Sequence, residues 1–129
     1  YGSMVRMVEQ AAQQLTELGI SAEGIDVQTL LPFDVNHVIG ESVSKTNRVV
    51  FIDEDVSGGA TAFMMQKVIE EQGGYFSLDS EPKTLTAKDH RPAYGSDGDY
   101  FSKPSIEDIV DSVYDLFNEL DSAKFPRIY

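Results

Sequence analysis

Three consecutive carboxylates, Asp53, Glu54 and Asp55, are the residues of this sequence whose types and spacing could do chemistry. They follow an apolar run at residues 49–52, and a glycine pair at residues 58–59 separates them from a segment with the pattern of a helix. Enzymes place catalytic carboxylates, metal ions and phosphates where a strand gives way to a glycine turn and a helix N-terminus. The segment therefore raises three chemical hypotheses and one structural hypothesis.

The first hypothesis is a calcium site. Asp53, Asp55, Ser57 and Gly58 match positions 1, 3, 5 and 6 of an EF-hand loop. Position 12 of that loop must supply a bidentate Glu, and here it is Met64. The segment before the loop is also strand-like rather than helical. The sequence therefore excludes an EF-hand.

The second hypothesis is phosphoryl transfer. An apolar strand that ends in Asp-x-Asp is similar to the first motif of the haloacid dehalogenase phosphatases, in which Asp53 would be the nucleophile and Asp55 the general acid, helped by magnesium. Ser57 stands where that family favours Thr or Val, and no paired-Asp metal motif follows downstream. These two departures count against the hypothesis. A self-contained magnesium-dependent phosphatase that uses Asp53 and Asp55 is kept only as the alternative function.

The third hypothesis is a phosphate cradle formed by Gly58 and Gly59 at a helix N-terminus. The preceding carboxylates oppose a phosphate, and the sequence has neither a Walker lysine nor a G-x-G-x-x-G motif. The structural hypothesis is that Gly58 and Gly59 let the backbone turn sharply, while the acids lie at the solvent end of a strand. Negative charge is favourable there, next to a helix N-terminus. The sequence favours this structural turn.

Composition places the chain among single-domain globular proteins. It has 129 residues, of which 41% are hydrophobic and 25% charged, and it contains no cysteine. The formal net charge of −12 is uneven, with six acids and three bases in residues 1–50 and sixteen acids and seven bases in residues 51–129. So acidic a chain repels phosphate backbones and anionic lipid, which excludes nucleic acid and membranes as partners. We expect a reducing, cytoplasmic location.

Hydrophobic periodicity predicts an alternation of helices and short strands. Ser3, Asp34 and Ser105 are predicted to cap helices, and Gly19 to end the first one. Helices are predicted at residues 4–18, 35–43, 60–71 and 105–120, strands at residues 22–28, 48–52 and 83–87, and a long loop at residues 89–103.

This order of elements predicts an α/β fold with three α/β/α layers, in which a mostly parallel sheet is covered by helices on both faces. Such domains usually begin with a strand, whereas this chain opens directly on a helix cap at Ser3. We therefore expect that the first strand of the sheet is missing and that the chain is a fragment of a longer one. An unpaired sheet edge or gap should mark the place of that strand.

The last predicted helix is strongly two-sided. Its apolar residues fall on one face, and its acidic residues Asp108, Asp111, Asp115 and Glu119 form a stripe on the other. Like charges at these spacings repel one another along the helix. The stripe is either a solvated face or a surface for docking a basic partner. The predicted apolar face consists of Ile106, Ile109, Val110, Val113, Leu116, Phe117 and Leu120.

Several motifs in a fixed order carry a family resemblance. They are "YGS" before a helix, "GISAEGIDVQTLLPFD", "SVSKTNRVVFIDED" followed by "GG", and a proline before the last helix. Together they resemble the C-terminal domain of the transketolase superfamily, and more closely the end of the beta part of the thiamine-diphosphate-dependent 2-oxo acid dehydrogenases. Gly24, Gln28 and Phe33 depart from the usual pattern. The resemblance predicts a domain at residues 1–121 and a tail at residues 122–129.

The resemblance implies a function in assembly and docking rather than catalysis. In that family thiamine diphosphate and magnesium bind to other parts of the enzyme, which implies no catalytic, cofactor or metal residue here and gives Gly58 and Gly59 a structural role. The whole enzyme would oxidatively decarboxylate a branched-chain 2-oxo acid, with pyruvate as the alternative substrate. Implied partners are other domains or the alpha part, in a homo- or hetero-oligomer, and the basic peripheral subunit-binding domain of an acyltransferase core.

Overall fold

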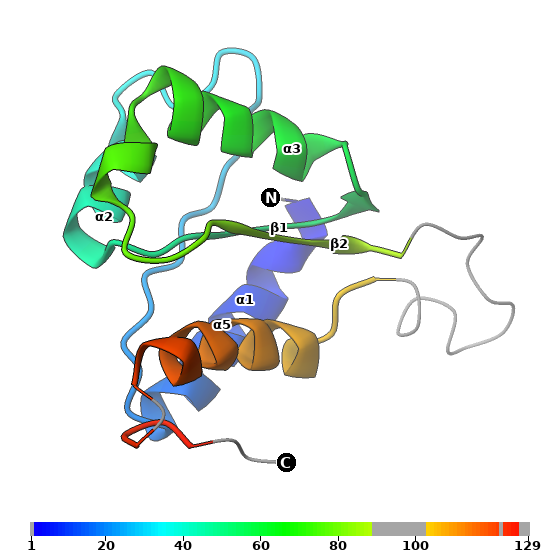
Figure 1. Ribbon diagram of the computed structural model, residues 1–129. Coiled ribbons are helices and arrows are strands. Elements are labelled where there is room, and N and C mark those ends of the chain that lie inside the picture. The colour runs from blue at the N-terminus through cyan, green and yellow to red at the C-terminus, as the bar shows by residue number, and fades with distance from the viewer. Residues whose placement is uncertain (1, 89–102, 122, 127–129) are drawn as a thin grey trace, which may run out of the picture.

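The computed structural model describes residues 2–88, 103–121 and 123–126, and it has the three layers expected from the sequence. A parallel pair of strands, β1 (Val50–Val56) and β2 (Lys83–Ala87), forms the middle layer. The helices α2 (Val38–Thr46) and α3 (Ala60–Met65) lie on one side of it, and α1 (Val5–Glu17) and α5 (Ile106–Leu120) on the other (Figure 1). No helix among the described residues is long and apolar enough to cross a membrane.

Two hydrophobic cores hold the layers together, one on each face of the sheet. Alternation along β1 divides its side chains between them, because successive residues of a strand point to opposite faces. Phe51 packs with α2 and α3, while Ile52 packs against the cluster formed by α1 and α5. The first core contains Ile39, Val43, Phe51, Met64 and Val68, and the second contains Met4, Ala11, Leu15, Ile20, Ile109, Val110, Tyr114 and Phe125.

The described part of the chain contains only these two strands, so β1 has a strand partner on one edge alone. Val50 lies opposite Lys83 and Ile52 opposite Leu85, and the register shifts between Ile52 and Val56. The predicted strand at residues 83–87 is confirmed, and β1 runs four residues further than predicted, into the acidic corner. Among the described residues, no strand lies along the other edge of β1, and the missing first strand stays a prediction.

The strand predicted at residues 22–28 is wrong as a secondary structure element. This segment crosses the molecule as an extended trace without regular structure (Figure 1). Ile25 and Val27 are half-buried while Asp26 and Gln28 are exposed, which is the alternation of a strand. The alternation is present, but no described strand lies beside the segment to form a ladder.

The first helix begins differently from the prediction and ends as predicted. A short 3-10 turn at Gly2–Met4 leads into α1, and Ser3 does not cap it, because the serine hydroxyl bonds elsewhere. Gly19 follows the last turn with φ of 84°, in the left-handed region that glycine adopts without strain.

The middle helices follow the predicted capping but not every boundary. The carboxylate of Asp34 accepts hydrogen bonds from the backbone N–H groups of Val38 and Ile39, at 2.9 and 3.1 Å, so its predicted capping role is confirmed. The helix itself spans Val38–Thr46, three residues later than predicted. The helix predicted at residues 60–71 is present, as α3 continued by a π-helix at Gln66–Glu71.

The last helix, α5, is confirmed together with its cap. Ser105 Oγ accepts a hydrogen bond from the Asp108 N–H at 3.1 Å, and the Ser105 N–H donates to Asp108 Oδ2 at 2.9 Å, which forms a capping box. The predicted apolar face is wrong at its end, because Leu120 is 57% exposed, whereas the unpredicted Tyr114 is buried. Phe125 packs edge-on against Tyr114. Apart from Lys103, the predicted loop at residues 89–103 lies outside the described residues.

Candidate functional site

In the acidic corner, two of the three carboxylates hold their own backbone turn. Asp53 is 4% exposed, and its Oδ2 accepts a hydrogen bond from the Asp55 N–H at 3.3 Å. Asp55 Oδ1 in turn accepts from the Val56 N–H at 2.8 Å. One oxygen of each of these two carboxylates is therefore engaged in a local backbone contact.

The third carboxylate, Glu54, ties three distant segments together. Its Oε2 accepts a hydrogen bond from the Ser3 hydroxyl at 2.7 Å and forms an ion pair with Lys103 Nζ at 3.0 Å. The Ser3 hydrogen bond, followed by the hydrogen bond and charge of Lys103, lowers the pKa of Glu54 below its ordinary value. Glu54 thus joins the N-terminal turn, the carboxyl end of β1 and the residues before α5.

The glycine pair after the acids lies in tight backbone geometry. Gly58 has φ of 86°, where an L side chain is strained. A Cβ atom on Gly59 would lie 2.6 Å from Asp55 Oδ2 and 3.1 Å from the carbonyl oxygen of Val56. A side chain at residue 59 would therefore collide with Asp55 and Val56, whereas a Cβ atom on Gly58 would meet no atom within 4 Å.

Metal ligands do not gather in the described part of the chain, where no group of three or more His, Cys, Asp or Glu residues could hold an ion. The magnesium and diphosphate of thiamine diphosphate need carboxylate and amide oxygens around the metal. That this chain binds no cofactor stays a prediction.

The acidic stripe on α5 divides into engaged and unpaired carboxylates. Asp108 belongs to the capping box, and Glu119 lies 4.0 Å from Lys83 Nζ, so both already have partners. Asp115 is exposed and Asp111 half-buried, and neither forms a hydrogen bond or ion pair with any described residue. The centre of the stripe is therefore the part that can attract another molecule.

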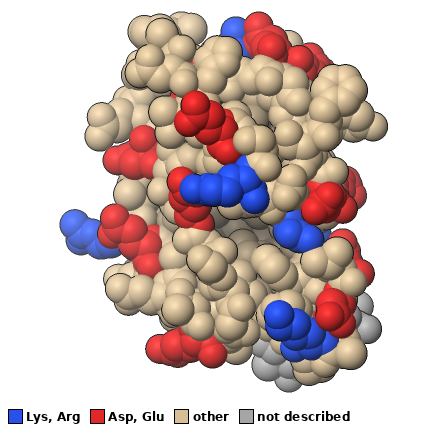
Figure 2. Space-filling view, turned by 90° about the vertical axis from the view of Figure 1, so that its left-hand side faces the viewer, with Lys and Arg blue, Asp and Glu red and all other residues tan. Residues whose placement is uncertain are grey.

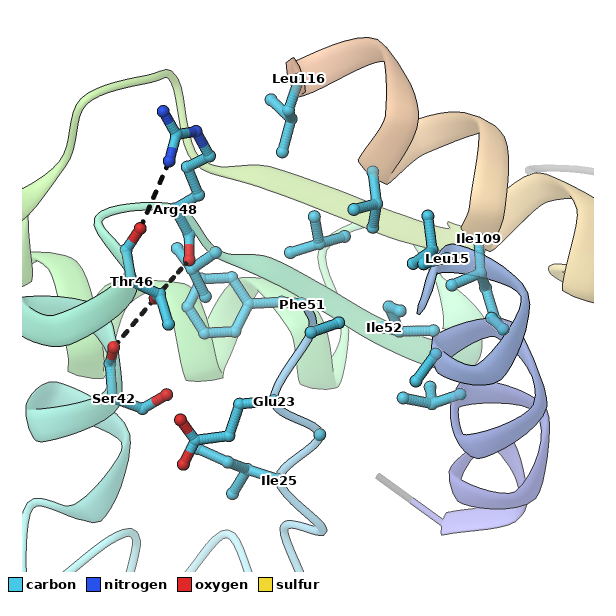
Figure 3. Close-up of a pocket in the computed structure, with 18 of the residues that line it drawn as sticks. Leu15, Glu23, Ile25, Ser42, Thr46, Arg48, Phe51, Ile52, Ile109 and Leu116 are labelled. Carbon is cyan, nitrogen blue, oxygen red and sulfur yellow. Dashed lines mark hydrogen bonds between the residues drawn. The ribbon is translucent and has the colours of Figure 1, made fainter. Parts of the chain in front are cut away.

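An apolar groove of about 310 Å³ is a feature that the sequence did not reveal. It runs between β1 and residues 20–27, with α1 and α5 on one side and α2 and α3 on the other (Figure 3). Figure 2 shows a hollow at the centre of the adjoining face, with acidic and basic side chains at its rim. The apolar side chains that line the groove include Leu15, Ile20, Ile25, Val27, Ile39, Val43, Val50, Phe51, Ile52, Met64, Ile109, Val113, Leu116 and Phe117.

Among the described residues that line the groove, Arg48 is the one basic residue, and it stands just before β1. Its guanidinium lies 5.0 Å from the centre of the Phe117 ring, and Nη1 donates to the carbonyl oxygen of Thr46 at 3.4 Å. Its Nε is buried and finds no hydrogen-bond acceptor in the part of the chain that the structure describes. A buried donor without a partner is costly, which marks this end of the groove as incomplete.

These features define an α/β domain whose charged corner is closed by internal contacts and whose sheet is open along one edge. The chain belongs to the family described as the transketolase C-terminal domain, which matches residues 1–103. The resemblance stated from the sequence is confirmed. The match ends just before α5, so the acidic stripe lies outside the matched residues.

The curated relatives are beta subunits of 2-oxo acid dehydrogenases. The chain is 34% identical over 111 residues to the pyruvate dehydrogenase E1 component subunit beta-1, mitochondrial, of Arabidopsis thaliana, which covers 85% of this chain and 30% of that protein. It is 36% identical over 89 residues to the 2-oxoisovalerate dehydrogenase subunit beta of Bacillus subtilis (strain 168), covering 69% of this chain and 27% of that protein. The chain thus spans about a third or less of the length of these relatives.

Proposed function

We propose that this chain is the C-terminal domain of the beta part of a 2-oxo acid dehydrogenase. We propose further that it functions in assembly and docking rather than in catalysis. The observation that carries this proposal is the engagement of the corner acids in internal contacts. Asp53 and Asp55 hold the turn, and Glu54 binds Ser3 and Lys103. The names of the relatives, all beta subunits, support the same conclusion.

In the whole enzyme, thiamine diphosphate and magnesium would supply the decarboxylation chemistry on other parts of the protein. The substrate would be a branched-chain 2-oxo acid, with pyruvate as the alternative, since relatives of both names match this chain. Assaying the complete enzyme with 2-oxoisovalerate and with pyruvate decides between them. If the complete enzyme turns over neither of these two 2-oxo acids, the assignment to this class is contradicted.

Docking is proposed to use the acidic stripe of α5, Asp108, Asp111, Asp115 and Glu119. Asp111 and Asp115 lie at its centre without a described partner, which leaves their charge available to a basic surface. The proposed partner is the basic peripheral subunit-binding domain of an acyltransferase core. Charges of this kind act at a distance, so they raise the association rate more than they slow dissociation.

The docking proposal is tested by measuring association of that basic domain with the complete dehydrogenase after Asp111→Asn and Asp115→Asn. We expect the association rate to fall about two- to tenfold at low salt, with the difference shrinking as salt screens the charges. Glu70→Gln is the matched control, because Glu70 is exposed on the π-helix at Gln66–Glu71, which continues α3 on the opposite side of the sheet from α5. Equal rates for the double variant and the parent contradict the role of the stripe.

A further inference from the structure

We propose that the segment after α5, described at residues 121 and 123–126, is a strap that holds the C-terminal half of this helix and so positions the acidic stripe. The strap acts on the end of α5 that carries Asp115 and Glu119. This inference rests on the docking function proposed above, and it adds the element that keeps the docking surface in one arrangement. Both α5 and the strap follow residue 103, where the match to the family ends.

The C-terminal end of α5 is unfavourable by itself. Its last turn contains no basic residue, although positive charge is favourable there, because the peptide dipoles leave the C-terminal end of a helix partly negative. Two carboxylates, Glu119 and Asp121, lie at this end instead. Helix ends fray even in ordinary cases. The last turns of α5 therefore depend on contacts from elsewhere in the chain.

The strap turns back toward α5 directly after the helix ends. Asp121 Oδ1 accepts a hydrogen bond from the Lys124 N–H at 3.2 Å. The carbonyl oxygen of Asp121 accepts a second hydrogen bond, from the Phe125 N–H at 2.9 Å. Figure 1 shows this segment beside the C-terminal end of α5. The Asp121 carboxylate thus stabilises the turn with which the strap begins, as short acidic side chains do by bonding to nearby backbone.

Two side chains of α5 then hold the strap by its backbone. The Tyr114 hydroxyl donates a hydrogen bond to the carbonyl oxygen of Pro126 at 2.8 Å. Asn118 Nδ2 donates to the carbonyl oxygen of Phe125 at 2.7 Å. Helix residues four positions apart lie one above the other on the same face. The two donors therefore bind consecutive carbonyls of the strap, which runs back along the helix.

Phe125 anchors the strap in the hydrophobic core. It is 7% exposed and belongs to the core cluster that α1 and α5 share. The centre of its ring lies 6.0 Å from that of Tyr114 and 5.2 Å from that of Phe117, both in edge-on geometry. Buried aromatic rings contribute strongly to core packing. Phe125 is therefore the residue on which the strap depends most.

The strap lies beside the centre of the acidic stripe without neutralising it. At about 100° per residue, Asn118 projects from α5 about 20° away from Asp111 and about 60° away from Asp115. The strap binds Asn118, yet both carboxylates stay without a hydrogen bond or ion pair to any described residue. Lys124 also forms no ion pair with a described carboxylate, and its Nζ lies 5.4 Å from the centre of the Phe125 ring. The strap can thus fix the helix and leave its charge available.

A fixed helix matters for docking because charges steer a partner only from defined positions. An ordered set of carboxylates attracts a basic surface in one orientation, which raises the association rate. If the end of α5 frayed, Asp115 and Glu119 would be spread over many positions. The partner would then have to order the helix on binding, which costs affinity. Phe125, Tyr114 and Asn118 are therefore assigned as positioning residues.

The test compares Phe125→Ala with its parent in the complete dehydrogenase. Ala123→Ser is the matched control, because Ala123 is exposed on the same strap, and neither substitution changes the charge of the chain. We expect amide hydrogen exchange of residues 114–120 to become at least about tenfold faster in Phe125→Ala. The association rate of the basic subunit-binding domain at low salt should fall about two- to threefold. The control should equal the parent in both measurements.

A double-mutant cycle determines whether the strap acts through the stripe. In a background that carries Asp111→Asn and Asp115→Asn, Phe125→Ala should make exchange of residues 114–120 faster as before. It should slow association less than it does in the parent, because the charges that it displaces are already gone. Equal slowing in both backgrounds overturns the proposal, since the strap would then influence docking by another route.

A milder variant keeps the test decisive if Phe125→Ala does not fold, as judged by far-UV circular dichroism. Tyr114→Phe combined with Asn118→Ala removes both polar anchors and leaves Phe125 in the core. We expect exchange of residues 114–120 to become about threefold faster and association to slow by less than in Phe125→Ala. Phe125→Leu, which keeps most of the apolar volume, should retain more of the parent behaviour than Phe125→Ala in both measurements.

The outcomes separate the strap from the docking function on which it rests. Unchanged exchange of residues 114–120 in the strap variants means that the strap does not hold α5. Faster exchange with an unchanged association rate means that it is a structural element only. Either result overturns the strap while the effect of Asp111→Asn with Asp115→Asn on docking persists. If these two substitutions leave association unchanged, the docking function itself fails, and the positioning role of the strap fails with it.

Discussion

The strand β1 passes from the apolar groove at residues 49–52 to the acidic corner at residues 53–55. The two halves differ in how many contacts they make with the rest of the molecule. In the corner, Asp53, Glu54 and Asp55 all have partners within the molecule. Along the groove, the edge of β1 has no described strand beside it, and Arg48 Nε has no acceptor among the described residues. The acidic half, whose residue types suggest catalysis, is held by internal contacts. The apolar half borders a groove.

This difference shows that residue type alone does not identify the surface that is available to another molecule. Carboxylates attract notice in a sequence, but their partners can come from the same molecule, as Ser3 and Lys103 do for Glu54. An open sheet edge carries no unusual residue, because it consists of ordinary apolar side chains and backbone groups. In the described part of this chain, the open surface is an apolar groove beside a strand edge, not the acidic corner.

The largest predicted effect concerns the wall of the groove. Leu116→Ala should lower the free energy of unfolding by about 2 kcal/mol, near the low end for a buried leucine, because the groove already leaves one side of Leu116 open. Leu120→Ala on the same helix should cost less than about 0.5 kcal/mol, since Leu120 is 57% exposed. Chemical denaturation measures both. A loss of about 4 kcal/mol or more for Leu116→Ala would show that the wall is packed as a closed core.

The next effect concerns the closed corner. Gly59→Ala should destabilise the fold by about 1–2 kcal/mol, because its Cβ meets the Asp55 carboxylate and the Val56 carbonyl. Gly58→Ala should cost a similar amount for another reason, its φ of 86°. Adding Asp55→Ala removes one obstacle and should recover part of the Gly59→Ala loss but none of the Gly58→Ala loss. Equal recovery in both would mean that the corner is not crowded.

A smaller effect comes from the pH dependence of Glu54. Because Ser3 and Lys103 lower its folded-state pKa, the contact stabilises the fold above the ordinary carboxyl pKa and is lost as pH falls through the lowered value. Its side chain is 39% exposed, so screening limits the contribution to a few tenths of a kcal/mol. Thermal melts from pH 6.5 down to about pH 3 should fall less steeply for Glu54→Gln than for the parent. If Tm falls with pH equally in Glu54→Gln and the parent, the contact of Glu54 with Ser3 and Lys103 does not stabilise the fold. Glu9→Gln is the control, because Glu9 is exposed.

The smallest expected effect is on phosphatase activity. The chain with magnesium and a generic phosphate monoester should give background turnover. Asp53→Asn should change nothing, since the side-chain amide oxygen of this variant can still accept from the Asp55 N–H. Magnesium-dependent turnover that vanishes in Asp53→Asn would instead establish the phosphatase alternative with Asp53 and Asp55 as its residues.

The sequence predicted those elements whose signals are local. The helix α5 was predictable because Ser105 and Asp108 form a cap three residues apart and the apolar residues repeat at helical spacing. The role of Ser3 was not, because its hydroxyl bonds to Glu54, 51 residues away. A capping pattern cannot exclude a competing acceptor that only the tertiary fold brings close.

The same reasoning explains the strand at residues 22–28 and the missed groove. Ile25 and Val27 are half-buried between exposed neighbours, as in a strand, but a strand also needs a hydrogen-bonded neighbour, which is a property of the whole sheet. The groove itself is formed by residues that look like core in the sequence, such as Phe51 and Leu116. The expectation that a first strand is missing was the one feature of the sequence that pointed to the groove.

The most direct test of the account is amide hydrogen exchange of the 129-residue chain alone and within the complete dehydrogenase proposed above. The account predicts that residues 21–27 and 50–52, the walls of the groove, exchange at least about tenfold more slowly in the complete protein. The acidic corner at residues 53–55 should change little, because its contacts are already made within the chain. Equal exchange at the walls in both forms, or protection confined to the corner, would contradict the account.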